Sequence, residues 1–251
     1  MSANSMINIK TPAELKILRE AGKILASIIS KIKCSLKSGV TKREVDSKAE
    51  EIIKTHKVIP AFKEYRGFPG CVCLSVNEEV VHGIPGEHIL KEGDIVSLDV
   101  GIIYKGYYSD TAVTVAIGTI KQELQRLLDV TLESLYKGIE QTRVDNHLSD
   151  VSHAIQKYTE ANQFSIVREF VGHGIGKNLH EDPEIPNFGP PHQGPVLREG
   201  MVFAIEPMVN LGGSTTKILS DGWTVVTEDG KPSAHFEHTV AIGRNGPEIL
   251  T

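Results

Sequence analysis

The amino-acid sequence predicts an α/β (α+β) fold, in which two similar half-domains share one curved antiparallel sheet backed by helices. Three observations favour this prediction. Helical and strand-like stretches follow one another in the order two helices, strands, two helices, strands. One stretch has the pattern of a long β-hairpin, and a segment of the first half recurs in the second half. Halves of this kind pack with a pocket where they meet.

The composition is that of an ordinary globular chain. The 251 residues suffice for one large domain or two small ones. No linker suggests a place to divide them, so we expect a single domain over residues 1–251. The net charge of −5 disfavours electrostatic binding to nucleic acid or to an anionic membrane. No apolar run approaches the roughly 20 residues that span a bilayer.

Several features indicate the cytoplasm. Residues 1–10 lack a basic segment followed by an apolar core, so no signal peptide is recognised, and the native start is either Met1 or Met6. The odd number of cysteines suits a reducing compartment better than a disulfide framework. A zinc site would need a second cysteine pair, so we expect Cys71 and Cys73 to be small fillers beside a pocket.

Sequence signals place four helices. Residues 11–14 form a capping box with proline at the first helical position, and a helical apolar stripe follows that ends before Gly39. Residues 41–44 repeat the capping signal for a second helix, which Pro60 would stop. Apolar periodicity predicts two more helices, at about 120–138 and 148–161.

The other segments have strand and loop character. Residues 62–82 combine aromatic residues, loop signals and a β-prone run. After Asn162 the chain is strand-like to its end, apart from a loop rich in proline and glycine at 182–195.

The hairpin at residues 94–118 brings two aspartates together. It turns at residues 105–106, where glycine supplies the positive φ of a tight turn, so Asp99 faces Ala112. Asp110 lies two positions along and therefore on the same face, roughly 7–8 Å from Asp99 at the backbone. Such a pair could bind one metal ion or two. Alternatively, one aspartate caps the turn or faces water on an edge strand.

A repeat links the two halves. Residues 92–99, EGDIVSLD, align with residues 199–206, EGMVFAIE, so that apolar residues coincide and both segments end in a carboxylate. A shorter echo lies upstream of each, HGIP at 82–85 and HGIG at 173–176. We interpret the repeat as an internal duplication; chance similarity over eight residues is the alternative.

The second half adds three polar side chains in apolar surroundings. Glu206 lies in the apolar strand MVFAIEP, Glu237 lies in AHFEHTVAI, and His173 stands between glycines that clear space around its ring. With Asp99 and Asp110 they make four carboxylates and one imidazole, which would repel one another unless divalent cations neutralised them. This ligand set favours Mn, Fe, Co or Zn, in a bridged pair roughly 3.5–4 Å apart.

Taken together, the motifs resemble those of the type I methionine aminopeptidases, metallopeptidases with the pita-bread fold. HGIP, LDV, DTA, GHGIG, LHEDP, AIEP and FEHT occur in family-like order over nearly the whole chain. The resemblance implies a dinuclear site in which Asp110 and Glu237 bridge the two ions, and Glu206 also acts as the general base. The implied metal ligands are Asp99, Asp110, His173, Glu206 and Glu237.

The resemblance also implies roles for two more histidines. His82 would hydrogen-bond the backbone of the second substrate residue, and His180 would stabilise the developing oxyanion. His235 and His238 flank a ligand, so support of the metal site and a plain structural role both stay open. The histidines expected to be ordinary core or surface residues are His56, His88, His147, His153 and His192.

A pocket for the methionine side chain is implied around Tyr65, Phe68, Cys73 and Trp223. Aromatic walls and soft contacts suit an unbranched thioether. Without the resemblance, each aromatic residue would be interpreted as plain core. Leu179 departs from the family, which usually has an aromatic residue there, and this leaves the breadth of the pocket open.

The implied function is removal of the N-terminal methionine from nascent proteins and peptides, by a metal-bound hydroxide. We expect a cytoplasmic monomer, with the ribosome as a candidate partner. One alternative is a proline-directed aminopeptidase of the same fold, which usually carries an extra N-terminal domain. Another is a non-catalytic pita-bread binding protein, which would have lost ligands. A type II methionine aminopeptidase would carry a helical insertion, and none is evident.

Overall fold

A computed structural model describes residues 7–251, so the choice between Met1 and Met6 lies outside the described residues. The helices in this range are α1 (Pro12–Lys33), α2 (Lys42–Thr55), α3 (Gln122–Ile139) and α4 (Leu148–Ala161), with a 3-10 turn at Tyr65–Gly67. The strands are β1 (Ile59–Pro60), β2 (Cys73–Val76), β3 (Glu79–Val81), β4 (Ile95–Tyr104), β5 (Tyr107–Ala116), β6 (Ser165–Ile166), β7 (Gly172–Gly174), β8 (Glu181–Ile185), β9 (Val202–Ile205), β10 (Met208–Asn210), β11 (Thr216–Ile218), β12 (Val225–Thr227), β13 (Ser233–His235), β14 (Glu237–Gly243) and β15 (Gly246–Ile249).

The helices begin where the sequence signals place them. Thr11 and Thr41 each accept a hydrogen bond from the backbone of a glutamate three residues on, and that glutamate bonds back to the cap backbone. The predicted helices near 120–138 and 148–161 are confirmed as α3 and α4. The predicted order of two helices, strands, two helices and strands is therefore confirmed.

The largest sheet has the order β1-β4-β5-β14-β9-β7-β8, with β2 and β15 paired at its sides. The predicted hairpin is confirmed as β4 and β5, and its register places Asp99 opposite Ala112. Lys105 and Gly106 form the turn with φ of 50° and 79°, the left-handed values that a tight hairpin requires.

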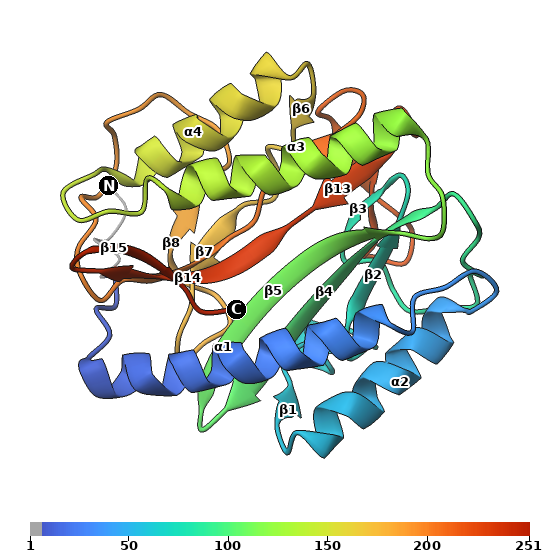
Figure 1. The fold of residues 1–251 in the computed structure, drawn as a ribbon, viewed down its shortest axis with the longest axis horizontal. Helices are drawn as coiled ribbons and strands as arrows, with labels where there is room; N and C mark the ends of the chain where they lie inside the picture. Colours follow the sequence, from blue (N-terminus) through green and yellow to red (C-terminus); the bar gives the residue numbers. More distant parts are fainter. Residues whose placement is uncertain (1–6) are drawn as a thin grey trace.

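The two halves meet where β5 pairs with β14. On one side β4 pairs with β5, and on the other β9 pairs with β14, all antiparallel. Figure 1 shows α1 and α2 along one half and α3 and α4 along the other. The core accordingly has two large parts, which contain Leu25 and Leu98 in the first half and Leu127 and Phe203 in the second. The predicted curved antiparallel sheet backed by helices is confirmed.

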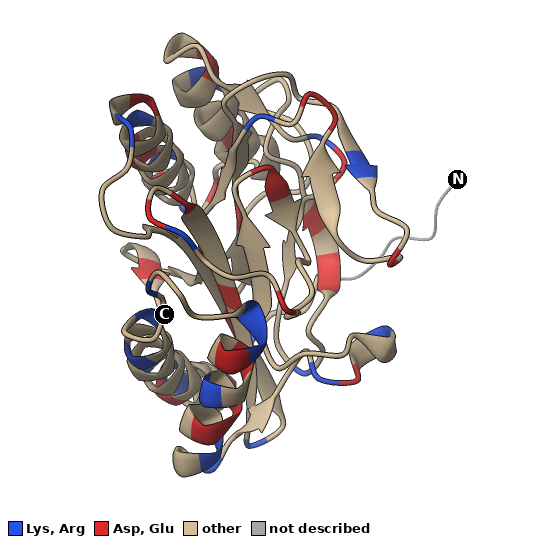
Figure 2. Ribbon diagram, turned by 90° about the vertical axis from the view of Figure 1, so that its right-hand side faces the viewer, with Lys and Arg blue, Asp and Glu red and all other residues tan. Residues whose placement is uncertain are grey.

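The helices cover one face of the sheet and leave the other for the site (Figure 2). Side chains alternate between the faces, so Asp110 and Glu237 line a cavity on the open face. Thr111 and His238, their neighbours in sequence, face a groove between α1 and α3. No helix in residues 7–251 has the length and apolar character needed to cross a bilayer.

Two local expectations are corrected. The predicted loop 182–195 begins later, because Glu181–Ile185 pairs with β7 as strand β8. Glu206 lies one residue beyond β9, which ends at Ile205, rather than within a strand. Its backbone carbonyl accepts a hydrogen bond of 3.1 Å from the side-chain amide of Asn187 instead of one from a neighbouring strand.

Replacing Thr41 by alanine should lower the free energy of unfolding by about 1 kcal/mol, because the first turn of α2 loses its side-chain acceptor. Thr41→Ser keeps the hydroxyl and should remain near the wild-type value. Urea denaturation followed by circular dichroism measures both. Equal losses in the two variants would contradict the capping role.

Candidate metal centre and substrate cavity

The five side chains proposed as metal ligands come from five segments, of which only β4 and β5 follow one another directly in the chain. Asp99 lies on β4, Asp110 on β5, His173 on β7 and Glu237 on β14, while Glu206 follows β9. Adjacent strands of one sheet carry them, so all five line the same cavity. Four of them are buried, and the side chain of Glu206 is 12% exposed.

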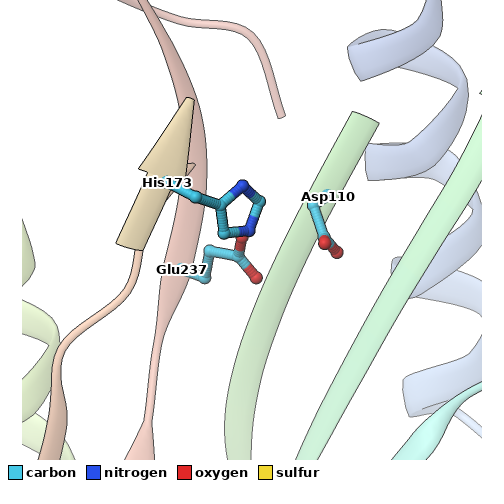
Figure 3. A group of neighbouring side chains, drawn as sticks. All are labelled: Asp110, His173 and Glu237. Atoms are coloured by element: carbon cyan, nitrogen blue, oxygen red, sulfur yellow. The ribbon is translucent and has the colours of Figure 1, made fainter. Parts of the chain in front are cut away.

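Asp110, His173 and Glu237 offer ligand atoms that all lie within 4.8 Å of one another. Figure 3 shows these side chains converging on one point from three strands. Asp99 and Glu206 flank this group: the Asp110 carboxylate raises the pKa of both, in addition to the larger effect of their burial. The structure thus brings together all five residues that the sequence singled out.

Two strands are tied together at Asp110 by a threonine. Regular pairing of β5 with β14 covers Glu237 opposite Ala112 and His238 opposite Thr111. One position farther on, the Thr239 hydroxyl accepts from the Asp110 backbone N–H at 3.1 Å and donates to its carbonyl at 2.8 Å. This side chain continues the ladder and fixes Asp110 relative to Glu237.

The protonation of His173 is set by its backbone neighbour. Its Nδ1 lies 2.9 Å from the carbonyl oxygen of Gly174. Because a carbonyl oxygen only accepts, Nδ1 carries the proton and the Nε2 lone pair is free for a cation. Burial also lowers the pKa of His173 to about 3, which keeps the ring neutral at physiological pH.

The glycines beside His173 serve the backbone rather than the ring, which corrects the reason inferred from the sequence. A Cβ on Gly172 would lie 2.4 Å from the Ala204 carbonyl oxygen, and one on Gly174 would lie 2.2 Å from that of Asp182. Both glycines therefore allow β7 to lie close to its neighbours.

The donor set fits divalent metal ions. Burial raises the pKa of Asp99, Glu206 and Glu237 well above the usual range, and it raises the pKa of Asp110 to about 7. Asp99 Oδ1 and Glu237 Oε1 are buried without a hydrogen-bond partner. Buried carboxylate oxygens that repel one another and lack donors are stabilised when a cation coordinates them.

Two further histidines, His82 and His180, line the same cavity. His180 Nδ1 lies 2.9 Å from the Tyr65 hydroxyl, and its ring centroid lies 4.3 Å from that of His173. His82 has φ of 59° and presents its ring to the edges of Phe170 and Trp223. Burial, followed by the charge of His180, lowers the pKa of His82 to about 4.

The cavity beside the cluster has a volume of about 190 Å³. Its wall includes all of the predicted pocket residues, and Phe68 meets Trp223 edge to face with ring centroids 5.2 Å apart. Leu179 also lines it, in place of an aromatic side chain. Other lining residues were not predicted from the sequence, because no motif marks them; they are Phe62, Arg66, Val81, Phe170 and Val171.

The remaining histidines separate into two groups. His235 lies near Glu206, whereas His238 faces the helices and bonds the Thr251 hydroxyl through Nδ1 at 3.0 Å. The five expected to be ordinary residues lie outside the cavity wall; they are His56, His88, His147, His153 and His192.

Residues 16–244 match metallopeptidase family M24. The chain belongs to this family. A curated relative, methionine aminopeptidase 1 of Bacillus subtilis, is 55% identical over 246 residues, which cover 98% of this chain and 99% of the relative. The crystal structure of a methionine aminopeptidase from Thermotoga maritima superposes with a TM-score of 0.96 at 48% identity, covering 98% of this chain and 99% of that one.

These comparisons confirm the predicted family and fold. A prolidase from Pyrococcus furiosus shares the fold at a TM-score of 0.78, with 23% identity, covering 97% of this chain and 65% of the prolidase. The mixed α/β architecture is therefore the pita-bread fold of M24 metallopeptidases. The chain is a metallopeptidase whose family uses divalent metal ions.

Asp110→Asn should stabilise the metal-free protein at pH 8 by at least about 1 kcal/mol, because a neutral amide removes one buried charge. The folded pKa of Asp110, about 7, exceeds the ordinary 3.8, so this group lowers stability progressively as pH rises from 3.8 to about 7, and the full cost is present above 7. The gain should shrink as pH falls below 7. Urea unfolding in the presence of a chelator measures the difference in the free energy of unfolding between the variant and wild type.

The matched control is Asp129→Asn on the exposed side of α3. This substitution should change the free energy of unfolding little. A metal-free Asp110→Asn protein no more stable than wild type at pH 8 would show that the buried charges do not repel.

Proposed function

We propose that this metallopeptidase removes the N-terminal methionine from peptides and nascent proteins. The observation that carries the proposal is the identity of 55% with a methionine aminopeptidase over nearly the full length of both chains. The cavity supports it independently, because aromatic and sulfur-containing walls stand directly beside a cluster of carboxylates.

Two divalent cations, held by the five clustered side chains, would supply Lewis-acid activation of the attacking water and of the scissile carbonyl. The physiological metal is Co, Mn, Fe or Zn. Asp110 and Glu237 would bridge the ions, and Asp99, Glu206 and His173 would complete the ligand shell. Glu206 would take the proton of the attacking water as general base, since one of its oxygens faces the cluster.

His180 and His82 would act on the peptide itself. The Tyr65 hydroxyl, 2.9 Å from Nδ1, would donate to His180, whose Nε2–H would then donate a hydrogen bond to the carbonyl oxygen as negative charge develops. His82 would hold the backbone of the second residue. Phe170 and Trp223 support its ring on two sides.

The methionine side chain would occupy the part of the cavity formed by Tyr65, Phe68, Cys73 and Trp223. The edge-to-face pair of Phe68 and Trp223 offers the flat, polarisable surface that a thioether contacts well. Leu179 adds flexible aliphatic bulk to the wall.

We further propose that residues 1–251 act as one catalytic domain, as a monomer in the cytoplasm, on chain ends presented at the ribosome. The negative net charge supports protein rather than nucleic acid as the partner. Proline-directed cleavage is not favoured, because the likeness to prolidases at 23% identity reflects the fold alone. A non-catalytic role is not favoured either, because all five candidate ligands are present.

Purified protein should release methionine from Met-Ala-Ser, lose this activity in a chelator and regain it when a single divalent metal is added. Release is measured by chromatography of the products. Met-Pro and Ala-Ala-Ser peptides serve as controls for substrate class. A protein that stays fully active after complete metal removal would refute the mechanism.

His180→Ala should lower kcat by roughly 10²–10³-fold with a small change in KM, because the lost donor acts mainly on the transition state. His192→Ala, at an exposed position outside the cavity wall, should match wild type. Steady-state kinetics on Met-Ala-Ser measures kcat and KM for both variants. A rise in KM alone would contradict the expected role and assign His180 to substrate binding.

A further inference from the structure

His235 is a buried histidine whose side chain has no assigned partner. It is 1% exposed on β13, and both ring nitrogens are buried without a hydrogen-bond partner. Its backbone N–H and carbonyl are both bonded at 2.8 Å to the Thr114 hydroxyl of β5, which fixes the position of the ring. A buried imidazole without partners is costly, because a neutral ring keeps one donor and one acceptor.

The carboxylate of Glu206 lies close to this ring. The Nε2 atom of His235 lies 3.5 Å from Glu206 Oε2. An ordinary hydrogen bond would need this distance to shorten by roughly 0.6 Å. Since a carboxylate only accepts, the proton of His235 belongs on Nε2.

Glu206 has a histidine at each of its oxygens, but the two rings differ. His173 Nε2 lies 3.6 Å from Oε1, yet it carries no proton, because its Nδ1 proton bonds Gly174. His235 makes no competing contact and is the available donor. Oε2 is thereby directed to His235, while Oε1 is directed to the metal cluster.

We propose that His235 is a positioning residue that donates a hydrogen bond from Nε2 to Glu206 and so presents Oε1 to the metals and to the attacking water. Glu206 needs such support because it lies beyond β9 and is held otherwise through its backbone, by Asn187. The inference rests on the proposed role of Glu206 as ligand and general base. Groups that orient a metal ligand typically change metal affinity or activity 10–100-fold.

The decisive comparison is His235→Met against His235→Gln in the full chain. The two side chains have similar length, but only glutamine offers a donor. His235→Met should weaken Mn²⁺ binding, measured by calorimetry on metal-free protein, by roughly 10–100-fold and lower kcat similarly, with KM for Met-Ala-Ser within about threefold. His235→Gln should restore most of both. His238→Met is the control, because its ring faces the helices.

A measurement on wild-type protein guards against a variant that fails to fold. Nitrogen-15 spectra of the histidine rings in Zn²⁺-loaded protein should show His235 with its proton on Nε2. A proton on Nδ1, or equal losses in the methionine and glutamine variants, would overturn the proposal. Failure of wild type to cleave Met-Ala-Ser would instead contradict the proposed function, and the metal affinities and the ring protonation would still test His235.

Discussion

The site is governed by the repulsion among four buried carboxylates. Burial is the main reason that the pKa of each is raised, and the charge of Asp110 further raises the pKa of Asp99, Glu206 and Glu237. A fold that kept them together without compensation would lose stability, since an unpaired buried charge is among the costliest groups a core can hold. When divalent cations are bound, their attraction for the carboxylates outweighs the repulsion among the carboxylates. The same residues that destabilise the metal-free protein are the candidate ligands for the metal.

The sheet supplies the rigidity that such a cluster needs. Ligands on β4, β5, β7 and β14 keep their spacing because neighbouring strands are hydrogen-bonded, and Thr239 extends that ladder beside Asp110. Glycines at 172 and 174 let β7 approach closely enough to contribute His173. Glu206 differs from the other candidate carboxylate ligands in lying outside a strand, so its orientation depends more on the side chains around it than on the strand ladder.

Neutral histidines complete the cavity by carrying donors with a fixed direction. His173 presents the Nε2 lone pair to the cluster because its Nδ1–H donates a hydrogen bond to the Gly174 carbonyl oxygen. His180 and His82 are also kept neutral, as burial lowers the pKa of each. Protonated rings would compete with cations for the carboxylates. Neutral rings do not compete in this way and can still donate a hydrogen bond, so the same cavity can hold both cations and hydrogen-bond donors.

The sequence by itself determined the local elements and the family. Capping boxes fixed the starts of α1 and α2, the two-residue turn fixed the register that sets Asp99 opposite Ala112, and ordered motifs identified the M24 relatives. These features depend on interactions between residues close in the chain, or on residue identity alone. Tertiary structure decided the rest, because loop paths and close backbone approaches follow from the packing of distant segments. Only the fold could place Phe170 and Arg66 in the cavity wall, end β9 before Glu206, and bring His235 beside it.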